Sequence, residues 1–239
     1  MNALNRYWLV VPAAGEGRRF GADLPKQFAP LRDSTVLEAA LAPFLADTRC
    51  AGIVLVLSSA RLAGRPPLRA MPSHLVRVAG GAERVDSVLA GLDALAAGAL
   101  GQPVAAEEWV LVHDAARPCL STRDLEKLLA EGGLSAEGAL LATPVTDTIK
   151  QEGAGQRSAT TVPRTQLWRA LTPQMFRLGP LSLALRGART AGRLPTDEAE
   201  ALEWLGMRPL LVAAQDSNIK VTTAEDLKMA QAVLDGRSQ

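Results

Sequence analysis

The sequence predicts an α/β protein of Rossmann-like type, with a mostly parallel, twisted sheet that carries helices on both faces. Two observations carry this prediction. Short apolar runs alternate along the chain with longer segments of helical periodicity, which is typical of strands joined by right-handed helical crossovers. The short runs are apolar on both faces, as strands buried inside a parallel sheet are.

The predicted strands are short, often β-branched and bounded by turn residues. They cover residues 7–11, 52–57, 75–79, 109–113 and 138–143. Helical spacing between them covers residues 35–46, 84–97 and 121–130. We expect Ser34 or Thr35 to cap the first helix, with Glu38 at the capping-box distance, and Ser121 or Thr122 to cap the third.

The pattern changes after Pro144. Residues 145–167 contain Thr, Gly and Gln but few large apolar side chains, with Gly153-Ala154-Gly155 in their middle. Because such a segment buries little surface by itself, we expect a projecting β-hairpin arm that packs on a second copy and forms a homodimer. A helix at 196–205, a strand at 208–213 and a helix at 223–234 would then complete one domain over residues 1–239.

Composition excludes several classes of protein. The 26 Lys and Arg residues nearly balance the 25 Asp and Glu residues, so the general basic field of a nucleic-acid binder is missing. Two cysteines and two histidines cannot form a disulfide framework or a histidine-based metal cluster. No apolar run reaches the roughly 18–20 residues that span a bilayer, and the apolar N-terminal stretch runs into a charged glycine loop rather than a signal cleavage site. We therefore expect a cytoplasmic protein without nucleic-acid or membrane partners.

The most informative segment follows the first predicted strand. It reads Ala13-Ala14-Gly15-Glu16-Gly17-Arg18-Arg19-Phe20 and is followed by Pro25-Lys26. Small residues let a ligand approach the backbone, whose N–H groups can point at phosphate oxygens. Arg19 and Lys26 would add positive charge where the phosphates lie.

Two other kinds of glycine loop can be excluded by their spacing. A Walker loop needs Gly-Lys-Ser or Gly-Lys-Thr after four spacer residues, and a dinucleotide fingerprint needs Gly or Ala where this chain has Phe20. A strand-to-helix turn whose glycines serve geometry alone is the plain alternative. The attached basic residues favour a phosphate site.

Two further segments follow predicted strands. Gly80-Gly81 opens a turn in which backbone groups and the Ser87 hydroxyl could meet a base, although a plain strand-to-helix turn would look alike. His113-Asp114-Ala115-Ala116-Arg117-Pro118 ends the fourth strand. Ligands of open parallel sheets bind beyond the carboxyl ends of the strands, so Asp114 and Arg117 lie where chemistry is expected. Asp114 could instead cap a helix, and we expect His113 to be a packed strand residue.

The glycine loop resembles the start of the sugar-nucleotide pyrophosphorylases, a large nucleotidyltransferase family with Ala-Gly-x-Gly-x-Arg and a later Pro-Lys. Five later pieces extend the likeness: Pro144–Lys150, Pro163-Arg164, Leu171-Thr172-Pro173-Gln174, Thr196-Asp197-Glu198-Ala199 and Asn218-Ile219-Lys220-Val221-Thr222. In this order they resemble the 2-C-methyl-D-erythritol 4-phosphate cytidylyltransferases of non-mevalonate isoprenoid synthesis. The resemblance runs over residues 9–227.

The resemblance implies roles for matching residues. Four catalytic residues would carry charge, with Arg164 and Lys220 positioning the attacking phosphate: Arg19, Lys26, Arg164 and Lys220. The CTP site would be lined by Ala13, Ala14, Gly15, Gly17, Gly81 and Ser87. The sugar phosphate would be surrounded by Asp114, Arg117, Thr148, Thr172 and Thr196. The family's arm crosses to the neighbouring subunit, so Arg164 would serve the partner's site. Many relatives have an acidic residue where this chain has Ala82, which leaves only a backbone contact there.

This chemistry needs no strong base. The attacking phosphate has a second pKa of about 6 and is largely ionised at neutral pH, so catalysis rests on positioning and charge stabilisation. Mg²⁺, or another divalent cation, should bridge the phosphates while keeping several waters, and Asp114 is the candidate carboxylate near it.

Two alternatives remain open from the sequence. One is a cytidylyltransferase of the same fold that acts on a pentitol phosphate such as ribitol 5-phosphate. The other is a nucleotide-binding module that retained the fold without turnover.

Overall fold

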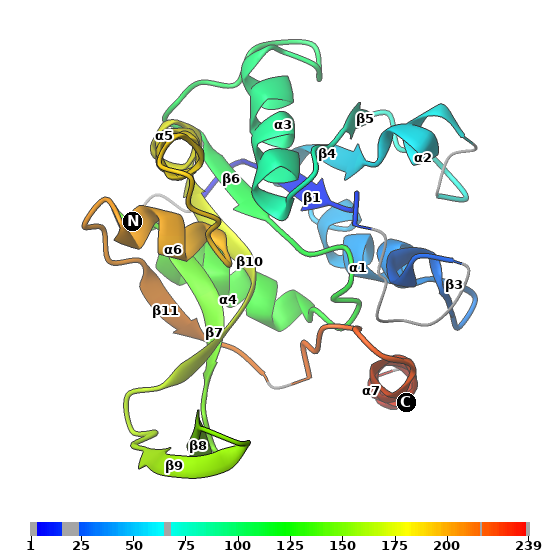
Figure 1. The fold of residues 1–239 in the computed structure, drawn as a ribbon. Coiled ribbons are helices and arrows are strands. Elements are labelled where there is room, and N and C mark those ends of the chain that lie inside the picture. Colours follow the sequence, from blue (N-terminus) through cyan, green and yellow to red (C-terminus); the bar gives the residue numbers. More distant parts are fainter. Residues whose placement is uncertain (1–3, 16–23, 65–67, 216, 238–239) are drawn as a thin grey trace.

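The computed structural model describes residues 4–15, 24–64, 68–215 and 217–237. Its centre is a seven-stranded sheet (Figure 1) with the strand order β11-β7-β10-β6-β1-β4-β5. These strands are β1 (Tyr7–Pro12), β4 (Cys50–Leu57), β5 (Leu75–Ala79), β6 (Trp109–Val112), β7 (Ala139–Pro144), β10 (Trp168–Arg177) and β11 (Leu210–Ala213). The five strands expected between residues 7 and 143 are all present, with ends shifted by at most two residues.

The sheet is mostly parallel, as predicted. β1 pairs in parallel with β4 and β6, β4 with β5, and β11 with β7. The exception is β10, which lies antiparallel between β6 and β7. This strand and the helix after it, α5 (Leu178–Thr190), were not predicted. The middle of β10 carries polar residues and a proline instead of a continuous apolar run.

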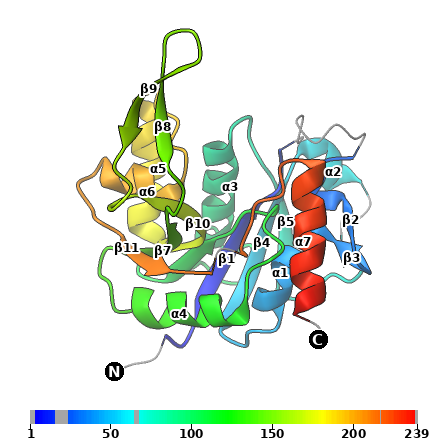
Figure 2. The same ribbon diagram turned by 90° about the horizontal axis from the view of Figure 1, so that it is seen from below.

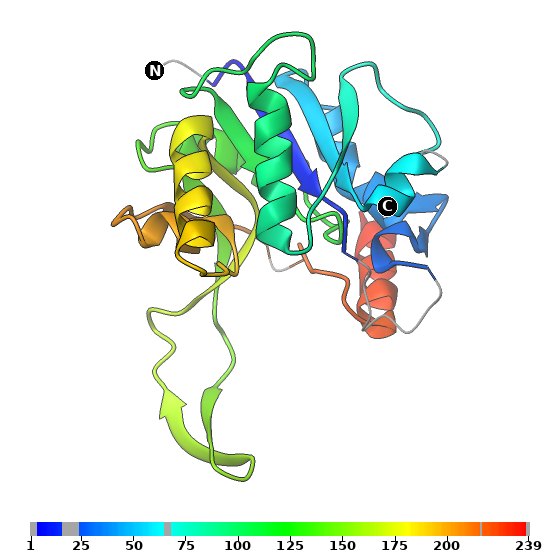
Figure 3. The ribbon, with the colours of Figure 1, turned by 45° about the horizontal axis from the view of Figure 1, so that its top comes forward.

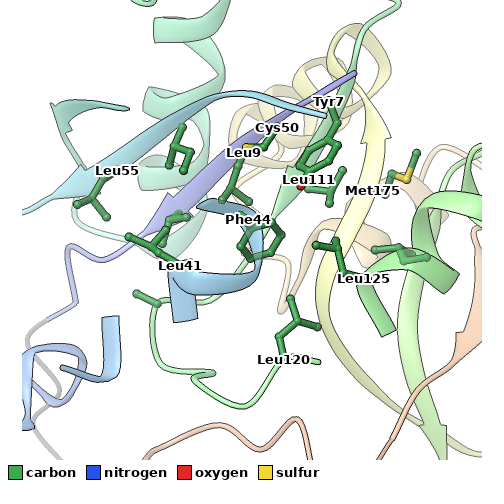
Figure 4. Packing of buried hydrophobic residues seen from close by; sticks show 14 of the residues in the cluster. Tyr7, Leu9, Leu41, Phe44, Cys50, Leu55, Leu111, Leu120, Leu125 and Met175 are labelled. Carbon is green, nitrogen blue, oxygen red and sulfur yellow. The ribbon is translucent and has the colours of Figure 1, made fainter. Parts of the chain in front are cut away.

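Helices cover both faces of the sheet. On one face, α1 (Val36–Leu45) and α4 (Thr122–Gly132) pack on one set of alternating strand residues. Figure 4 shows this layer, where Leu41 and Phe44 of α1 meet Leu9 and Leu111. On the other face, α3 (Arg84–Ala96), α5 and α6 (Glu198–Glu203) pack on the intervening strand residues. Figure 3 shows α3 and α5 side by side on this face.

The predicted caps are present at defined residues. Thr35 rather than Ser34 caps α1, and Glu38 completes the capping box. Ser121 rather than Thr122 caps α4 by accepting from the Asp124 N–H. The helix expected at 196–205 is the shorter α6, because Asp197 caps it by accepting from the Glu200 N–H.

Residues 149–162 form the predicted hairpin. β8 (Ile149–Gly153) pairs antiparallel with β9 (Arg157–Val162) in a sheet of its own, and the hairpin projects from the body of the protein (Figures 2 and 3). Nearly all of its residues are exposed or half-buried. This chain therefore offers the arm no packing surface beyond its base.

The remaining elements lie outside the seven-stranded sheet. They are a 3-10 helix η2 (Lys26–Phe28), β2 (Pro30–Leu31), β3 (Ser34–Thr35), α2 (Ser59–Ala63) and α7 (Ala224–Gly236). α7 packs through Ala230 on a small cluster that includes Val36, Cys119 and Val221. Within the described parts of the chain, no helix is both long and apolar enough to cross a membrane.

Candidate active site

A cleft of about 520 Å³ lies at the carboxyl ends of β1, β5 and β6. This is the position expected for a ligand of an open parallel sheet. Eight of the residues singled out from the sequence line it: Ala13, Ala14, Gly15, Lys26, Gly81, Ser87, Asp114 and Lys220. The fold thus brings three strand ends and a C-terminal segment to one place.

The small-residue loop after β1 is held by the side chain of Gln27, which was not predicted as a site residue. Gln27 is almost completely buried, and its amide donates to the carbonyls of Ala13 and Gly15, both at 2.8 Å. The Ala13 N–H donates to Val56 O of the neighbouring strand at 2.8 Å. Because its carbonyls are bound from behind, the loop has a fixed course past the cleft. Gly17 and Arg19 lie outside the described residues.

Gly80 shows why the second loop begins with glycine. A β-carbon at this position would lie 2.6 Å from Ser87 Oγ and 2.9 Å from the Ala14 β-carbon, which is closer than packed atoms approach. The turn at Gly80 therefore packs directly on the small-residue loop after β1. The Ser87 hydroxyl, expected near a base, donates to the Glu83 carbonyl at 3.3 Å within its own helix.

Asp114 is the electrostatic centre of the cleft. Its carboxylate is 2.8 Å from Lys220 Nζ, 3.1 Å from Arg84 Nη2 and 3.6 Å from Arg117 Nε. Burial alone would raise the pKa of this carboxyl, but the charges of Arg84, Lys220 and Arg117 outweigh burial and hold the pKa well below its usual range. Asp114 is therefore ionised at neutral pH.

Buried polar groups fix Asp114 and its neighbours from behind. The Asp114 N–H donates to Thr172 Oγ1 at 3.0 Å, and that hydroxyl is 3.1 Å from Nδ1 of His113. Nε2 of His113 lies 3.1 Å from the Arg117 carbonyl, which can only accept, so Nε2 carries the proton. Burial lowers the pKa of His113 to about 4. His113 is thus buried and packed, as the sequence predicted, although it directly follows β6 instead of lying within it.

Asn218 ties the C-terminal segment to the same layer. Its side-chain NH2 group donates to the Thr172 carbonyl at 2.8 Å, and its main-chain carbonyl accepts from Arg117 Nη1 at 2.9 Å. The Val221 N–H donates to Ala116 O at 2.7 Å. Lys220 lies between these two anchors, which directs its ammonium group to Asp114.

Arg84 is a further charged neighbour of Asp114, and it was not predicted as a site residue. Arg84 begins α3, lines the cleft and forms ion pairs with both Asp114 and the buried Glu198. The signal was present in the sequence, because Arg84 follows the Gly80-Gly81 turn and Glu198 belongs to the Thr-Asp-Glu-Ala segment. Only the fold shows that these segments meet.

Five predicted site residues do not line the cleft within this chain. Arg117 and Thr172 lie beneath it, buried behind Asp114. Thr196 is exposed and donates to Glu200 at 2.9 Å. Thr148 and Arg164 are exposed at the base of the arm. Their roles stay predictions.

A metal ion held by protein ligands does not fit the described site. Over residues 4–15, 24–64, 68–215 and 217–237, no group of three or more His, Cys, Asp or Glu residues is arranged to bind one. Asp114, the candidate near a metal, is already surrounded by three cations. A divalent ion would meet their repulsion there.

Small loops and clustered cations at the carboxyl ends of a parallel sheet suit a nucleoside triphosphate and an anionic acceptor, and they define a nucleotidyltransferase. Comparison with known proteins gives the particular family. The family model described as 2-C-methyl-D-erythritol 4-phosphate cytidylyltransferase matches residues 7–236. Relatives bearing this name are 49% identical in Acidithiobacillus ferrooxidans, over 99% of both chains, and 48% identical in Ectopseudomonas mendocina, over 93% of both.

Solved structures agree. A crystal structure of 4-diphosphocytidyl-2C-methyl-D-erythritol synthase is 35% identical, with a TM-score of 0.82 over 97% of this chain and 99% of the other. The 2-C-methyl-D-erythritol 4-phosphate cytidylyltransferase of Francisella tularensis is 31% identical, with a TM-score of 0.81 over 95% and 99%. The chain belongs to the 2-C-methyl-D-erythritol 4-phosphate cytidylyltransferase family, whose members are CTP-dependent enzymes.

Proposed function

We propose that the cleft beside Asp114 is where this enzyme carries out the family's reaction. That reaction transfers the cytidylyl group of CTP to 2-C-methyl-D-erythritol 4-phosphate, giving 4-diphosphocytidyl-2-C-methyl-D-erythritol and pyrophosphate. One observation supports the placement above all. The small-residue loop after β1 and the Asp114–Lys220 ion pair, from distant parts of the chain, line the same cleft.

In this proposal the nucleotide lies along the loops after β1 and β5. Backbone groups of Ala13, Ala14, Gly15 and Gly81 approach the phosphates and the base, and Lys26 lines the same side of the cleft. Arg19 and Gly17 are assigned to the nucleotide side of the cleft because they follow Gly15 in the sequence of the same loop. Ser87 shapes the pocket, since its hydroxyl is engaged with its own helix.

The acceptor lies on the side of Asp114 and Lys220. Lys220 attracts the acceptor phosphate, and Asp114 accepts hydrogen bonds from hydroxyl groups of the sugar alcohol. Arg117 and Thr172 act from beneath by fixing Asp114. Thr196 would contact the acceptor from the start of α6.

The bond changes are simple. An ionised oxygen of the acceptor phosphate attacks the α-phosphorus of CTP, a P–O bond forms, and the bond to the bridging oxygen of the β-phosphate breaks. The electron pair leaves with pyrophosphate. No proton has to be removed by the protein because the acceptor's second pKa is about 6. Lys26 and Lys220, with Arg19 and Arg164, would stabilise the charge that accumulates on phosphate oxygens in the transition state.

Enzymes of this family use divalent metal ions, and we propose Mg²⁺ for this chain. Such an ion neutralises charge on triphosphate oxygens and keeps several of its waters. It would be bound through the nucleotide, because the carboxylate of Asp114 is already held by three cations.

We further propose that the arm over residues 145–167 pairs two copies of this one-domain chain, in the cytoplasm. Thr148 and Arg164 would then complete the partner's acceptor site. The exposure of both residues, and of the arm as a whole, supports this placement.

Pyrophosphate release tests the function. The protein is incubated with CTP and Mg²⁺, with 2-C-methyl-D-erythritol 4-phosphate or with ribitol 5-phosphate as acceptor. We expect turnover with the methylerythritol phosphate alone. Turnover with the pentitol phosphate alone would show that a pentitol phosphate is the acceptor. CTP binding without turnover would indicate a nucleotide-binding module that is not an enzyme.

A further inference from the structure

Arg84 lines the cleft, yet its guanidinium group is occupied by the protein itself. Nε and Nη2 donate to Oδ1 of Asp114 at 3.2 and 3.1 Å. Nη1 and Nη2 donate to Oε1 and Oε2 of Glu198 at 2.6 and 3.1 Å. A guanidinium has five N–H donors, and four of these contacts go to the two carboxylates. Arg84 is therefore poorly placed to act as a free cation for phosphate.

Glu198 is a buried carboxylate that has almost no access to water. Its side chain is 1% exposed, and both of its oxygens accept from Arg84. Burial raises the pKa of Glu198 above its ordinary value, and the charge of Arg84 opposes that change. Since a buried carboxylate is costly unless it is paired, the pair with Arg84 has to be kept for Glu198 to remain ionised.

The pair sets the rotation of the Asp114 carboxylate. Arg84 binds Oδ1, whereas Lys220 and Arg117 face Oδ2. A carboxylate held through Oδ1 can present Oδ2 in only one direction, and that direction is where Lys220 lies at 2.8 Å.

Three elements meet at this point. Arg84 is the first residue of α3, Glu198 is the first of α6, and Asp114 follows β6. The guanidinium thus joins the nucleotide side of the cleft, after β5, to the acceptor side. The bidentate contact with Glu198 has a fixed planar geometry that a lysine could not reproduce.

We infer that Arg84 and Glu198 form a positioning pair for the acceptor: Glu198 orients Arg84, and Arg84 orients Asp114 and thereby the Lys220 ammonium group. This inference rests on the proposed function in one respect, the assignment of Asp114 and Lys220 to the acceptor. It predicts that disturbing Glu198, which lines no part of the cleft, affects the acceptor more than CTP.

Steady-state kinetics of Glu198→Gln test the pair. The amide keeps the shape and one acceptor atom but loses the charge that orients Arg84. We expect the KM for 2-C-methyl-D-erythritol 4-phosphate to rise about tenfold, since a hydrogen bond to a charged group is involved, with the KM for CTP within twofold. Glu203→Gln, exposed on the same helix, is the control and should leave both constants unchanged.

A purely structural role makes a different prediction. It would lower the melting temperature or the fraction of active enzyme while both KM values stay as in the wild type, and that result for Glu198→Gln would overturn the inference. Arg84→Lys keeps the charge without the planar fork, so it should also raise the acceptor KM selectively. An increase confined to the CTP KM would equally contradict the pair's placement.

A double variant guards against misfolding. Arg84→Met/Glu198→Met removes both charges and keeps apolar volume, a replacement that folded proteins often tolerate. We expect it to fold and to show the raised acceptor KM; wild-type KM values in it would overturn the inference. Inactivity of the wild-type enzyme itself would instead count against the proposed function.

Discussion

Lys220 Nζ lies 2.8 Å from Oδ2 of Asp114, and both residues line the same cleft although they are far apart in the sequence. Asp114 is buried whereas Lys220 is 41% exposed, so the ammonium group is held at the protein surface by a fixed carboxylate. In the proposed reaction, the acceptor phosphate would therefore meet a cation whose position is already set.

Lys220→Met should therefore impair turnover without loss of the fold. We expect kcat/KM for the acceptor to fall about 100-fold, because the loss of one preorganised charge donor costs that much in comparable sites. The KM for CTP should change less than threefold. Lys228→Met, on the exposed face of α7, is the matched control. Unchanged acceptor kinetics would remove Lys220 from the site.

Gln27→Met tests the support of the loop after β1. The substitution keeps the buried volume but removes both donors to Ala13 and Gly15. Each lost hydrogen bond is worth about 1 kcal/mol, so we expect the loss of both to raise the KM for CTP by up to about 30-fold, measured by pyrophosphate release at saturating acceptor. Gln102→Met, exposed and outside the cleft, should have no effect. An acceptor-specific change would place Gln27 elsewhere in the mechanism.

The crossed arm can be tested by complementation. Lys26→Ala and Arg164→Ala should each lower kcat by about 100-fold or more, through loss of a charge donor. If Arg164 serves the partner's site, a hybrid dimer contains one site with both residues intact, so mixing the two inactive proteins should restore activity. The absence of recovery, after subunit exchange has been verified with differently tagged chains, would contradict the crossed arrangement.

His113 predicts a pH dependence of stability. Burial lowers its pKa in the folded protein to about 4, below the ordinary value of about 6.5. Between these values the unfolded chain binds a proton that the folded protein does not, so stability is full above pH 6.5 and falls as the pH decreases toward 4.

From pH 6.5 to 5 the loss from this residue should be about 2 kcal/mol. Urea denaturation at both pH values measures it. In His113→Gln, which has no titrating group, that part of the loss should disappear even though the variant is less stable at neutral pH. An identical pH dependence in both proteins would show that His113 does not titrate as its burial implies.

The sequence by itself determined the α/β class, the parallel strands and the hairpin, because apolar periodicity and turn residues record local structure and burial. It also indicated most of the cleft, since the carboxyl ends of β1, β5 and β6 follow directly from recognising those strands. Asp114 and Lys26 were found in this way, whereas Lys220 was singled out only because its segment resembles that of the family.

The tertiary structure alone decided which distant side chains meet. β10 is central to the sheet although its own residues do not look like a buried strand, because its environment comes from β6 and β7 on either side. In the sequence alone, Gln27 looks like an ordinary loop residue, and Glu198 looks like the start of a helix. Their importance arises from partners far along the chain, and a buried polar contact of this kind leaves no periodic trace in the sequence.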